Sequence, residues 1–133
     1  MLPDQAMRIL LIILTSFLGL TAIAGGVGLL AGVAAPPVEA LSGSPFKDYT
    51  LPGLALLILV GGSGLAAAYL TARRSQYAPL ACAAAGAIIV IYEVVEILVI
   101  GSPPGVARNL QIFYFTLGVL ILLFSFSWLR LKR

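Results

Sequence analysis

The chain has 133 residues, of which 61% are hydrophobic and only 10% are charged, with a formal net charge of +3. Soluble domains carry about 25% charged residues, so this composition indicates an integral membrane protein. The single cysteine, Cys82, excludes an internal disulfide, and the absence of histidine excludes a Cys/His metal site and a bis-His haem. The basic residues lie near the ends of apolar stretches rather than in a stripe, so we expect no nucleic-acid binding.

Four apolar stretches of membrane-spanning length follow one another along the chain, each providing the roughly 20 residues that a helix needs to cross the hydrocarbon core. The predicted helices cover residues 6–35, 51–72, 78–101 and 109–129. A polar outer loop over 36–50 joins the first two helices, and the paired prolines of GSPPG end the third. The first stretch is too long for a signal-peptide core, and no basic segment precedes it, so we expect it to be retained. The sequence therefore predicts an all-α membrane protein, a four-transmembrane-helix bundle, with 1–133 forming a single integral membrane domain.

The distribution of Lys and Arg predicts the orientation of these helices. Of the 8 basic residues, six fall on one side of a four-span topology and two on the other. The first side holds Arg8, Arg73, Arg74, Arg130, Lys132 and Arg133, and the second holds Lys47 and Arg108. By the positive-inside rule, both termini are cytoplasmic and the outer loop faces the opposite side.

Small residues concentrate in three of the predicted helices, where they allow helix backbones to approach closely. They are Gly25, Gly28 and Gly32 in the first helix, Gly61, Gly62 and Gly64 in the second, and the run 81–86 in the third. We expect them to serve packing within one bundle. The alternative is that they form a contact face for a second copy of the chain or for a partner in a membrane complex. In either case the lipid bilayer is the expected surrounding of the helices.

Two acids, Glu93 and Glu96, are the only charged residues of the third helix. An ionisable side chain in the hydrocarbon costs on the order of 3 kcal/mol or more, so such residues usually face a bundle interior or a wet cavity. Residues three apart share one helix face. Tyr92 lies on the same side, four residues before Glu96, and is expected to be able to donate a hydrogen bond to it.

The start of the fourth helix presents further polar residues at a similar depth. These include Gln111 and Tyr114, and Arg108 is the basic residue nearest in sequence and the expected partner of Glu96. Three interpretations of this outer cluster remain open. It is a set of polar groups that satisfy one another and fix helix register, a site that handles protons or cations, or a pocket for a lipid or small molecule.

The outer loop is a second candidate site. It contains turn-forming residues, the aromatic residues Phe46 and Tyr49, and a Lys47–Asp48 pair. We expect it either to lie over the acids of the third helix as a lid or to be only an interfacial connection between two helices.

No combination of residues predicts catalysis. The serines have no histidine to activate them, and no glycine-rich phosphate loop is followed by a lysine. An acid pair can perform acid–base chemistry, but without a nucleophile or metal it gives weak support for an enzyme. We expect a non-enzymatic protein with no cofactor and no metal.

The segment GSPFKDYTLPGLALLILVGGSGLAAA, residues 43–68, resembles a pattern found in small bacterial four-helix membrane proteins. In that pattern Ser-Pro-Phe is followed by an acidic residue, a tyrosine and a Pro-Gly that opens an apolar helix. YEVVEILVIG and LQIFYFTLG, residues 92–101 and 110–118, resemble the third- and fourth-helix signatures of the same group. The resemblance implies a multi-pass protein of the bacterial cytoplasmic (inner) membrane with a single four-helix domain, and it implies no activity.

These features predict an accessory protein or complex subunit whose outer polar cluster is structural or binds a small partner. One alternative is an oligomeric, proton- or cation-coupled transporter or channel, and the other is a lipid or hydrophobic-ligand pocket. Both alternatives use Glu93 and Glu96. Residues 81–91 offer no polar side chain except Cys82, which disfavours a path through one protomer.

Overall fold

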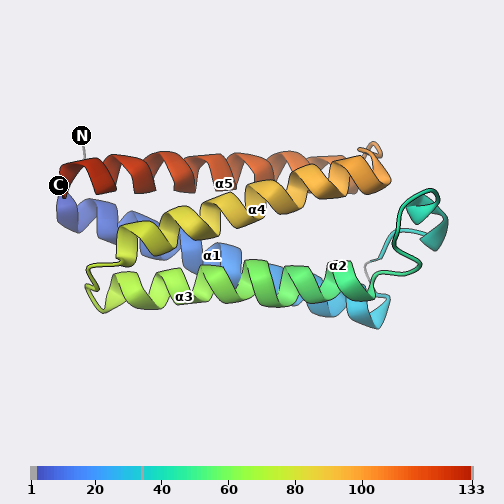
Figure 1. Cartoon of the computed structure of the whole chain (residues 1–133), viewed down its shortest axis with the longest axis horizontal. Coiled ribbons are helices and arrows are strands. Elements are labelled where there is room, and N and C mark those ends of the chain that lie inside the picture. The colour runs from blue at the N-terminus through green and yellow to red at the C-terminus, as the bar shows by residue number, and fades with distance from the viewer. Residues whose placement is uncertain (1–2, 34, 133) are drawn as a thin grey trace.

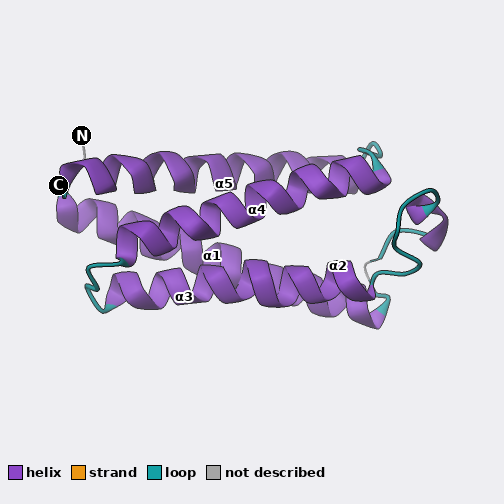
Figure 2. Cartoon of the chain, viewed as in Figure 1, coloured by secondary structure: helices purple, strands orange, loops and turns teal. Residues whose placement is uncertain are grey.

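The computed structural model describes residues 3–33 and 35–132, and these residues form helices and turns without a β-strand. Helix α1 spans Asp4–Ala31, α4 spans Ala78–Ile100 and α5 spans Val106–Leu131. Between α1 and α4 lies a continuous helical rod built from α2 (Thr50–Leu54), the π-helical segment η2 (Ala55–Val60) and α3 (Gly61–Ala72). A short 3₁₀ helix, η1 (Val38–Leu41), lies in the connection that precedes α2 (Figures 1 and 2).

Four helices are long and apolar enough to cross a membrane, as predicted: α1, the rod Thr50–Ala72, α4 and α5. Their outward faces carry large apolar side chains, among them Leu20, Ile58, Leu98 and Leu123. A soluble bundle would instead place charged and polar residues on those faces. The composition and the surface therefore agree on a helical membrane protein.

The helix boundaries differ from the predicted ones where glycine determines the end of a helix. The first helix ends at Ala31 instead of residue 35, because Gly32 adopts the left-handed conformation with φ 74°. The Gly32 amide donates to Leu29 O and the Val33 amide donates to Gly28 O, which is the Schellman pattern that closes a helix. The fourth span begins at Val106 rather than 109, directly after Gly105 with φ 100°.

The rods form two antiparallel pairs, α1 with α3 and α4 with α5. The start of α1, the α3–α4 turn and the end of α5 lie at one end of the bundle, which we call the terminal end (Figure 1). The 35–49 connection and the α4–α5 turn lie at the opposite end, which we call the loop end. The two pairs lie close together near the terminal end, and α4 diverges from the α2–α3 rod toward the loop end.

Glycines allow close helix contact within each pair. A Cβ added at Gly64 would lie 2.8 Å from the Gly19 amide nitrogen, so α1 and α3 touch backbone to backbone. A Cβ at Gly86 would lie 3.0 Å from Gly118 O, which brings α4 equally near to α5. Gly64 and Gly86 belong to the predicted small-residue sets, whereas Gly32 ends a helix and has open space around it. Gly64 and Gly86 thus serve packing inside one chain, as expected, whereas nothing lies within 4 Å of a Cβ added at Gly32 or Gly62.

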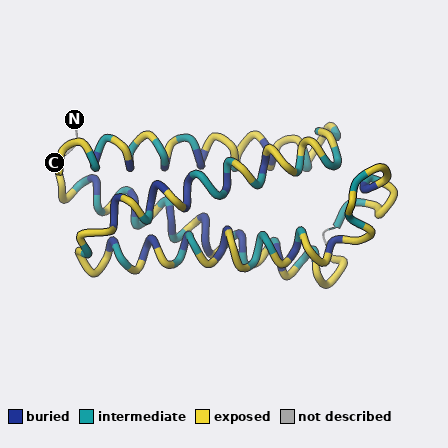
Figure 3. The backbone as a smooth tube through the Cα atoms, in the orientation of Figure 1, coloured by how far each residue is buried: buried dark blue, intermediate teal, exposed yellow. Residues whose placement is uncertain are grey.

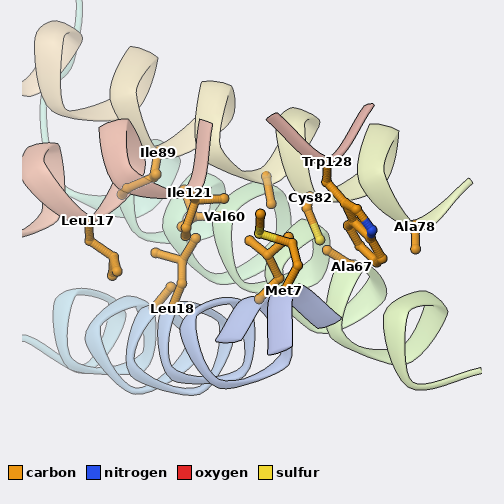
Figure 4. Packing of buried hydrophobic residues seen from close by; sticks show 13 residues of the cluster. Met7, Leu18, Val60, Ala67, Ala78, Cys82, Ile89, Leu117, Ile121 and Trp128 are labelled. Carbon is orange, nitrogen blue, oxygen red and sulfur yellow. The ribbon is translucent and has the colours of Figure 1, made fainter. Parts of the chain in front are cut away.

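The hydrophobic core fills the terminal half and the middle of the bundle (Figure 3). Met7, Cys82 and Trp128 pack together there, with further core residues contributed by all four rods (Figure 4). The Trp128 indole Nε1 donates a 2.7 Å hydrogen bond to Asp4 Oδ1, which ties α5 to α1. Arg8 also binds Asp4, at 2.7 Å, so the terminal end is closed by polar contacts above a dense apolar core.

Candidate functional site

A cleft of about 850 Å³ occupies the loop half of the bundle, where α4 and the α2–α3 rod diverge. Its walls come from α1, the 35–49 connection, α2, η2, α4 and α5. The lining is mostly aliphatic and aromatic, and it includes Leu59, Ile91 and Val95, whose side chains are also exposed on the bundle surface. The cleft is therefore open sideways between η2 and α4 as well as lying beneath the 35–49 connection.

The π-helical segment η2 forms one wall of this cleft. Ala55, Leu56, Leu59 and Val60 all line it. A π-helix shifts backbone hydrogen bonding by one residue relative to an α-helix, and such insertions are frequent at functional sites. Here the shift begins at Ala55, two residues after Gly53, and α-helical geometry resumes at Gly61.

Glu93 lies in the cleft without a protein partner. It is only 4% exposed and lines the cleft from α4. No described residue donates a hydrogen bond to its carboxyl group or forms an ion pair with it; its nearest charged neighbour is the acid Glu96. A carboxyl group that faces an apolar cleft without a protein donor is unfavourably placed, which makes Glu93 the main candidate for contact with a ligand.

Glu96 has a partner, and the partner is Gln111. Gln111 is 2% exposed, and its Nε2 donates to Glu96 Oε2 at 3.0 Å and to Gly101 O at 3.0 Å. Both amide hydrogens are used in this way, while Gln111 Oε1 is buried with no donor among the described residues. The predicted proximity of Glu96 and Gln111 is confirmed, and the pair leaves an unsatisfied acceptor beside the cleft.

The predicted ion pair between Arg108 and Glu96 is wrong. The Arg108 guanidinium donates to Ser102 O at 2.7 Å from Nη2 and at 3.1 Å from Nε, and it is exposed. It thereby braces the turn between α4 and α5 instead of reaching into the bundle. The described residues that line the cleft include no Lys or Arg.

Tyrosines of the site donate to backbone carbonyls rather than to the acids. The Tyr92 hydroxyl donates to Pro52 O at 3.2 Å, so the expected Tyr92–Glu96 hydrogen bond is absent and the tyrosine instead links α4 to α2 across the cleft. The Tyr49 hydroxyl donates to Pro37 O at 3.3 Å, which holds the 35–49 connection together. Tyr114 lines the cleft from α5, on the same cleft as the acids with which the sequence analysis grouped it.

Of the four residues of the predicted lid, two line the cleft and two do not. Phe46 and Tyr49 line the cleft, and Tyr49 is buried. Lys47 and Asp48 are exposed and lie outside the lining. Asp48 Oδ1 accepts a 3.0 Å hydrogen bond from the Thr50 amide two residues on, so it forms an Asx turn directly before α2 instead of pairing with Lys47.

The acidic character of the site also acts on Tyr49. Burial raises the pKa of the Tyr49 hydroxyl above its ordinary value, and the carboxylates of Glu96 and Glu39 raise it further. Tyr49 therefore stays a neutral hydrogen-bond donor to Pro37 O at neutral pH. Its aromatic ring, and not a charge, is what it presents to the cleft.

Sequence reasoning did not identify the walls supplied by α1 and η2. Gly25 and Leu29 of α1 line the cleft, as do the residues of η2, and the Pro52 carbonyl accepts the Tyr92 hydroxyl. Apolar residues in an apolar helix carry no signal that distinguishes a cleft from a lipid-facing surface. The proline–glycine step that opens the second helix was the one available signal, because it lies beside the position of the π-helical segment.

No protein-family model, curated protein or solved structure matches this chain.

Proposed function

We propose that this chain is a non-enzymatic accessory protein of the bacterial inner membrane that holds one lipophilic molecule in the loop-end cleft. In this account both termini are cytoplasmic, so the loop end lies in the outer half of the bilayer, in agreement with the distribution of basic residues. The observation that carries the proposal is an apolar cleft of about 850 Å³ that contains the buried, unpartnered Glu93.

The size and chemistry of the cleft support a small-molecule ligand. Ligand pockets have volumes of about 300–1,000 Å³ and combine an apolar lining with a few placed polar groups. Here the apolar lining surrounds Glu93, Glu96 and three tyrosines, Tyr49, Tyr92 and Tyr114. The apolar walls suit a hydrocarbon chain, and the polar groups suit the head of an amphiphile.

The opening between η2 and α4 supports access from the bilayer. The two edges of this opening are exposed and also line the cleft: Leu59 lies on the η2 side, and Ile91 and Val95 lie on the α4 side. In a membrane these side chains contact hydrocarbon, so a lipophilic molecule can enter without first crossing water. The Phe46 and Tyr49 rings then cover the cleft from the loop end.

The packing of the terminal half supports a closed-end cleft rather than transport. Met7, Cys82 and Trp128 are buried there and pack in the core. A coupled transporter needs a wet path from its acids to both sides of the membrane. The polar side chains buried in the rest of the described bundle, Thr15, Thr71 and Ser125, each donate to a backbone carbonyl of their own helix, which does not favour such a path. Among the alternatives predicted from the sequence, the ligand pocket fits the geometry best.

The proposal is tested with a photoactivatable alkanol, a diazirine on a twelve-carbon chain, added to the protein in phosphatidylcholine nanodiscs. We expect saturable labelling of the η2 and α4 walls that excess dodecanol prevents. Ala55→Phe fills the cleft and is expected to abolish this labelling, because Ala55 is part of the lining. Ala66→Phe, on the exposed face of the same rod, is the matched control and is expected to leave it unchanged.

Labelling that does not saturate, and that is as strong on exposed residues such as Leu98 as in the cleft, would contradict the proposal. Equal saturable labelling in the Ala55→Phe and Ala66→Phe variants would contradict it as well, because it would place the alkanol outside the cleft.

A further inference from the structure

We propose that the ligand of the cleft carries a protonated amine at its head, so that the site selects lipophilic ammonium compounds over neutral or anionic amphiphiles. This inference rests on the proposed function and names the chemical class of its ligand. It follows from the hydrogen-bonding groups that line the cleft, which are acceptors in excess of donors.

The hydrogen-bond acceptors at the cleft have few donors among the described residues. Glu93 is 4% exposed, lines the cleft and receives no hydrogen bond from a described residue. Glu96 lines the same cleft and receives a single donor, Gln111 Nε2. Gln111 Oε1, next to that contact, is buried without a donor. The two carboxyl groups that line the cleft therefore receive a single donor from the described part of the chain, and Gln111 Oε1 beside them receives none.

The donors of the site are already engaged. Tyr92 donates to Pro52 O and Tyr49 donates to Pro37 O, so these two hydroxyl groups offer only their oxygen lone pairs to a ligand. Both amide hydrogens of Gln111 are used within the protein. Tyr114 is the lining residue whose hydroxyl has no such bond among those described, and one hydroxyl does not serve two carboxyl groups.

A cation is missing as well. As far as the structure describes the chain, the lining contains two acids and no Lys or Arg, and the predicted partner, Arg108, binds Ser102 at the α4–α5 turn. A buried carboxylate is costly unless it is paired and hydrogen-bonded, and a cationic ligand would supply that pairing. A primary ammonium group provides one positive charge and three N–H donors in a single atom centre, which is what this set of acceptors lacks.

The aromatic residues add to the same selectivity. The rings of Tyr49, Tyr92 and Tyr114 line the cleft that holds Glu93 and Glu96. A cation near the face of an aromatic ring is attracted to it, most strongly where water is excluded. A carboxylate or phosphate head would instead meet two acids with no compensating cation, so anionic amphiphiles are expected to be rejected.

The test compares three amphiphiles with the same twelve-carbon chain, dodecylammonium, dodecanol and dodecanoate, as competitors of the alkanol photoprobe in phosphatidylcholine nanodiscs. In the natural protein we expect dodecylammonium to compete at least about tenfold better than dodecanol, the effect of a hydrogen bond to a charged group. Dodecanoate is expected to compete worst.

Two substitutions assign the preference to the acids. Glu93→Gln keeps the shape of the side chain and is expected to reduce the ammonium preference to within about threefold, while dodecanol still competes, which also shows that the variant is folded. Glu39→Gln removes an exposed acid outside the lining at the same end of the bundle and is expected to leave the preference unchanged.

The outcomes separate the two proposals. If dodecanol competes as well as dodecylammonium in the natural protein, the ammonium inference is wrong and the cleft remains a lipophilic-ligand site. If none of the three competes, both proposals are wrong. Equal loss of the preference for dodecylammonium in Glu93→Gln and Glu39→Gln would also overturn the inference. It would show that the negative charge at this end of the protein, and not the Glu93 carboxyl group in the cleft, attracts the ammonium compound.

The same assay identifies the source of the amine. In nanodiscs that contain phosphatidylethanolamine, a loss of dodecylammonium competition would assign the site to the amine of a lipid headgroup. Unchanged competition would assign it to a free lipophilic amine.

Discussion

Replacement of Gly64 by alanine tests whether α1 and α3 touch as closely as the structure shows. The added Cβ would lie 2.8 Å from the Gly19 amide nitrogen, 2.9 Å from Gly19 Cα and 3.0 Å from Thr15 O. All three atoms belong to the backbone of α1, so no side-chain rotation relieves the contact and the helices must separate by several tenths of an ångström.

The magnitude follows from two opposing effects. Overpacking costs about 1–3 kcal/mol, and the backbone nature of these contacts places Gly64→Ala in the upper part of that range. Alanine gains about 1 kcal/mol over glycine in a helix. We therefore expect a net loss of about 1–2 kcal/mol in the free energy of unfolding. Gly62→Ala is the matched control, because nothing lies within 4 Å of its added Cβ, and it is expected to be neutral or slightly stabilising.

The assay is reversible unfolding of the protein in mixed micelles by increasing SDS. The fluorescence of Trp128, the one tryptophan, reports on tertiary packing because its side chain lies buried in the core. A Gly64→Ala variant at least as stable as Gly62→Ala would refute the close α1–α3 contact, and with it the helix arrangement that opens the cleft.

Three further predictions concern polar contacts, and a fourth concerns topology. Gln111→Leu is expected to lower the free energy of unfolding in the SDS assay by about 1–3 kcal/mol, since it leaves the Glu96 carboxyl group without its donor; an unchanged value would refute that hydrogen bond. Asp4→Ala removes the acceptor of the Trp128 indole, 2.7 Å away, and is expected to cost about 1 kcal/mol and to shift the tryptophan emission, whereas Asp4→Asn should lose less. The pKa of Tyr49 is raised above 10.0, so the stability that its neutral hydroxyl gives is full below pH 10 and is lost as the pH rises beyond that. Tyr49→Phe should lack this alkaline loss, and identical alkaline profiles for the two proteins would contradict the assignment. A reporter fused to the C-terminus is expected to be active only in the cytoplasm, and activity on the outer side would overturn the topology.

The number of helices was predictable from sequence because twenty-residue apolar stretches are a strong signal. The helix ends were not predictable in the same way. The apolar sequence continues past Gly32, but the left-handed conformation of that glycine ends helix α1 at Ala31. The π-helical segment η2 was not predicted either. Its six residues are ordinary helix-compatible apolar residues, and nothing in their order marks the shift in hydrogen bonding.

For the site, proximity in sequence was a mixed guide. Glu93, Glu96 and Gln111 were correctly grouped, because helix periodicity and the short α4–α5 turn place them near one another. Arg108 was wrongly included, since a long, exposed side chain at a helix start binds the nearest free carbonyl, here Ser102 O, in place of a distant acid. Tyr92 was correctly placed at the site, but its hydroxyl donates to a carbonyl of another helix, which sequence spacing does not reveal.

The absence of Lys and Arg from the described lining of the cleft is thus the feature that the sequence-based prediction missed and that changes the functional account most. With Arg108 paired to Glu96, the acids would have been a self-satisfied structural cluster. With Arg108 bound at the α4–α5 turn, Glu93 and Glu96 line a largely apolar cleft without a basic partner among the described residues, which is the basis of the proposed ammonium selectivity.

The most direct measurement is nuclear magnetic resonance of protein labelled at its alanine methyl groups, in deuterated micelles with added dodecylammonium. We expect nuclear Overhauser effects between the alkyl chain and the methyl groups of Ala55 and Ala107, which line the cleft from η2 and α5. Ala66 and Ala84, exposed on the outer faces of α3 and α4, are the internal controls. Their methyl groups are expected to show Overhauser effects with dodecylammonium that are no stronger than those with added dodecanoate. Contacts confined to Ala66 and Ala84, with none at Ala55 or Ala107, would place the ligand on the lipid-facing surface and contradict the account.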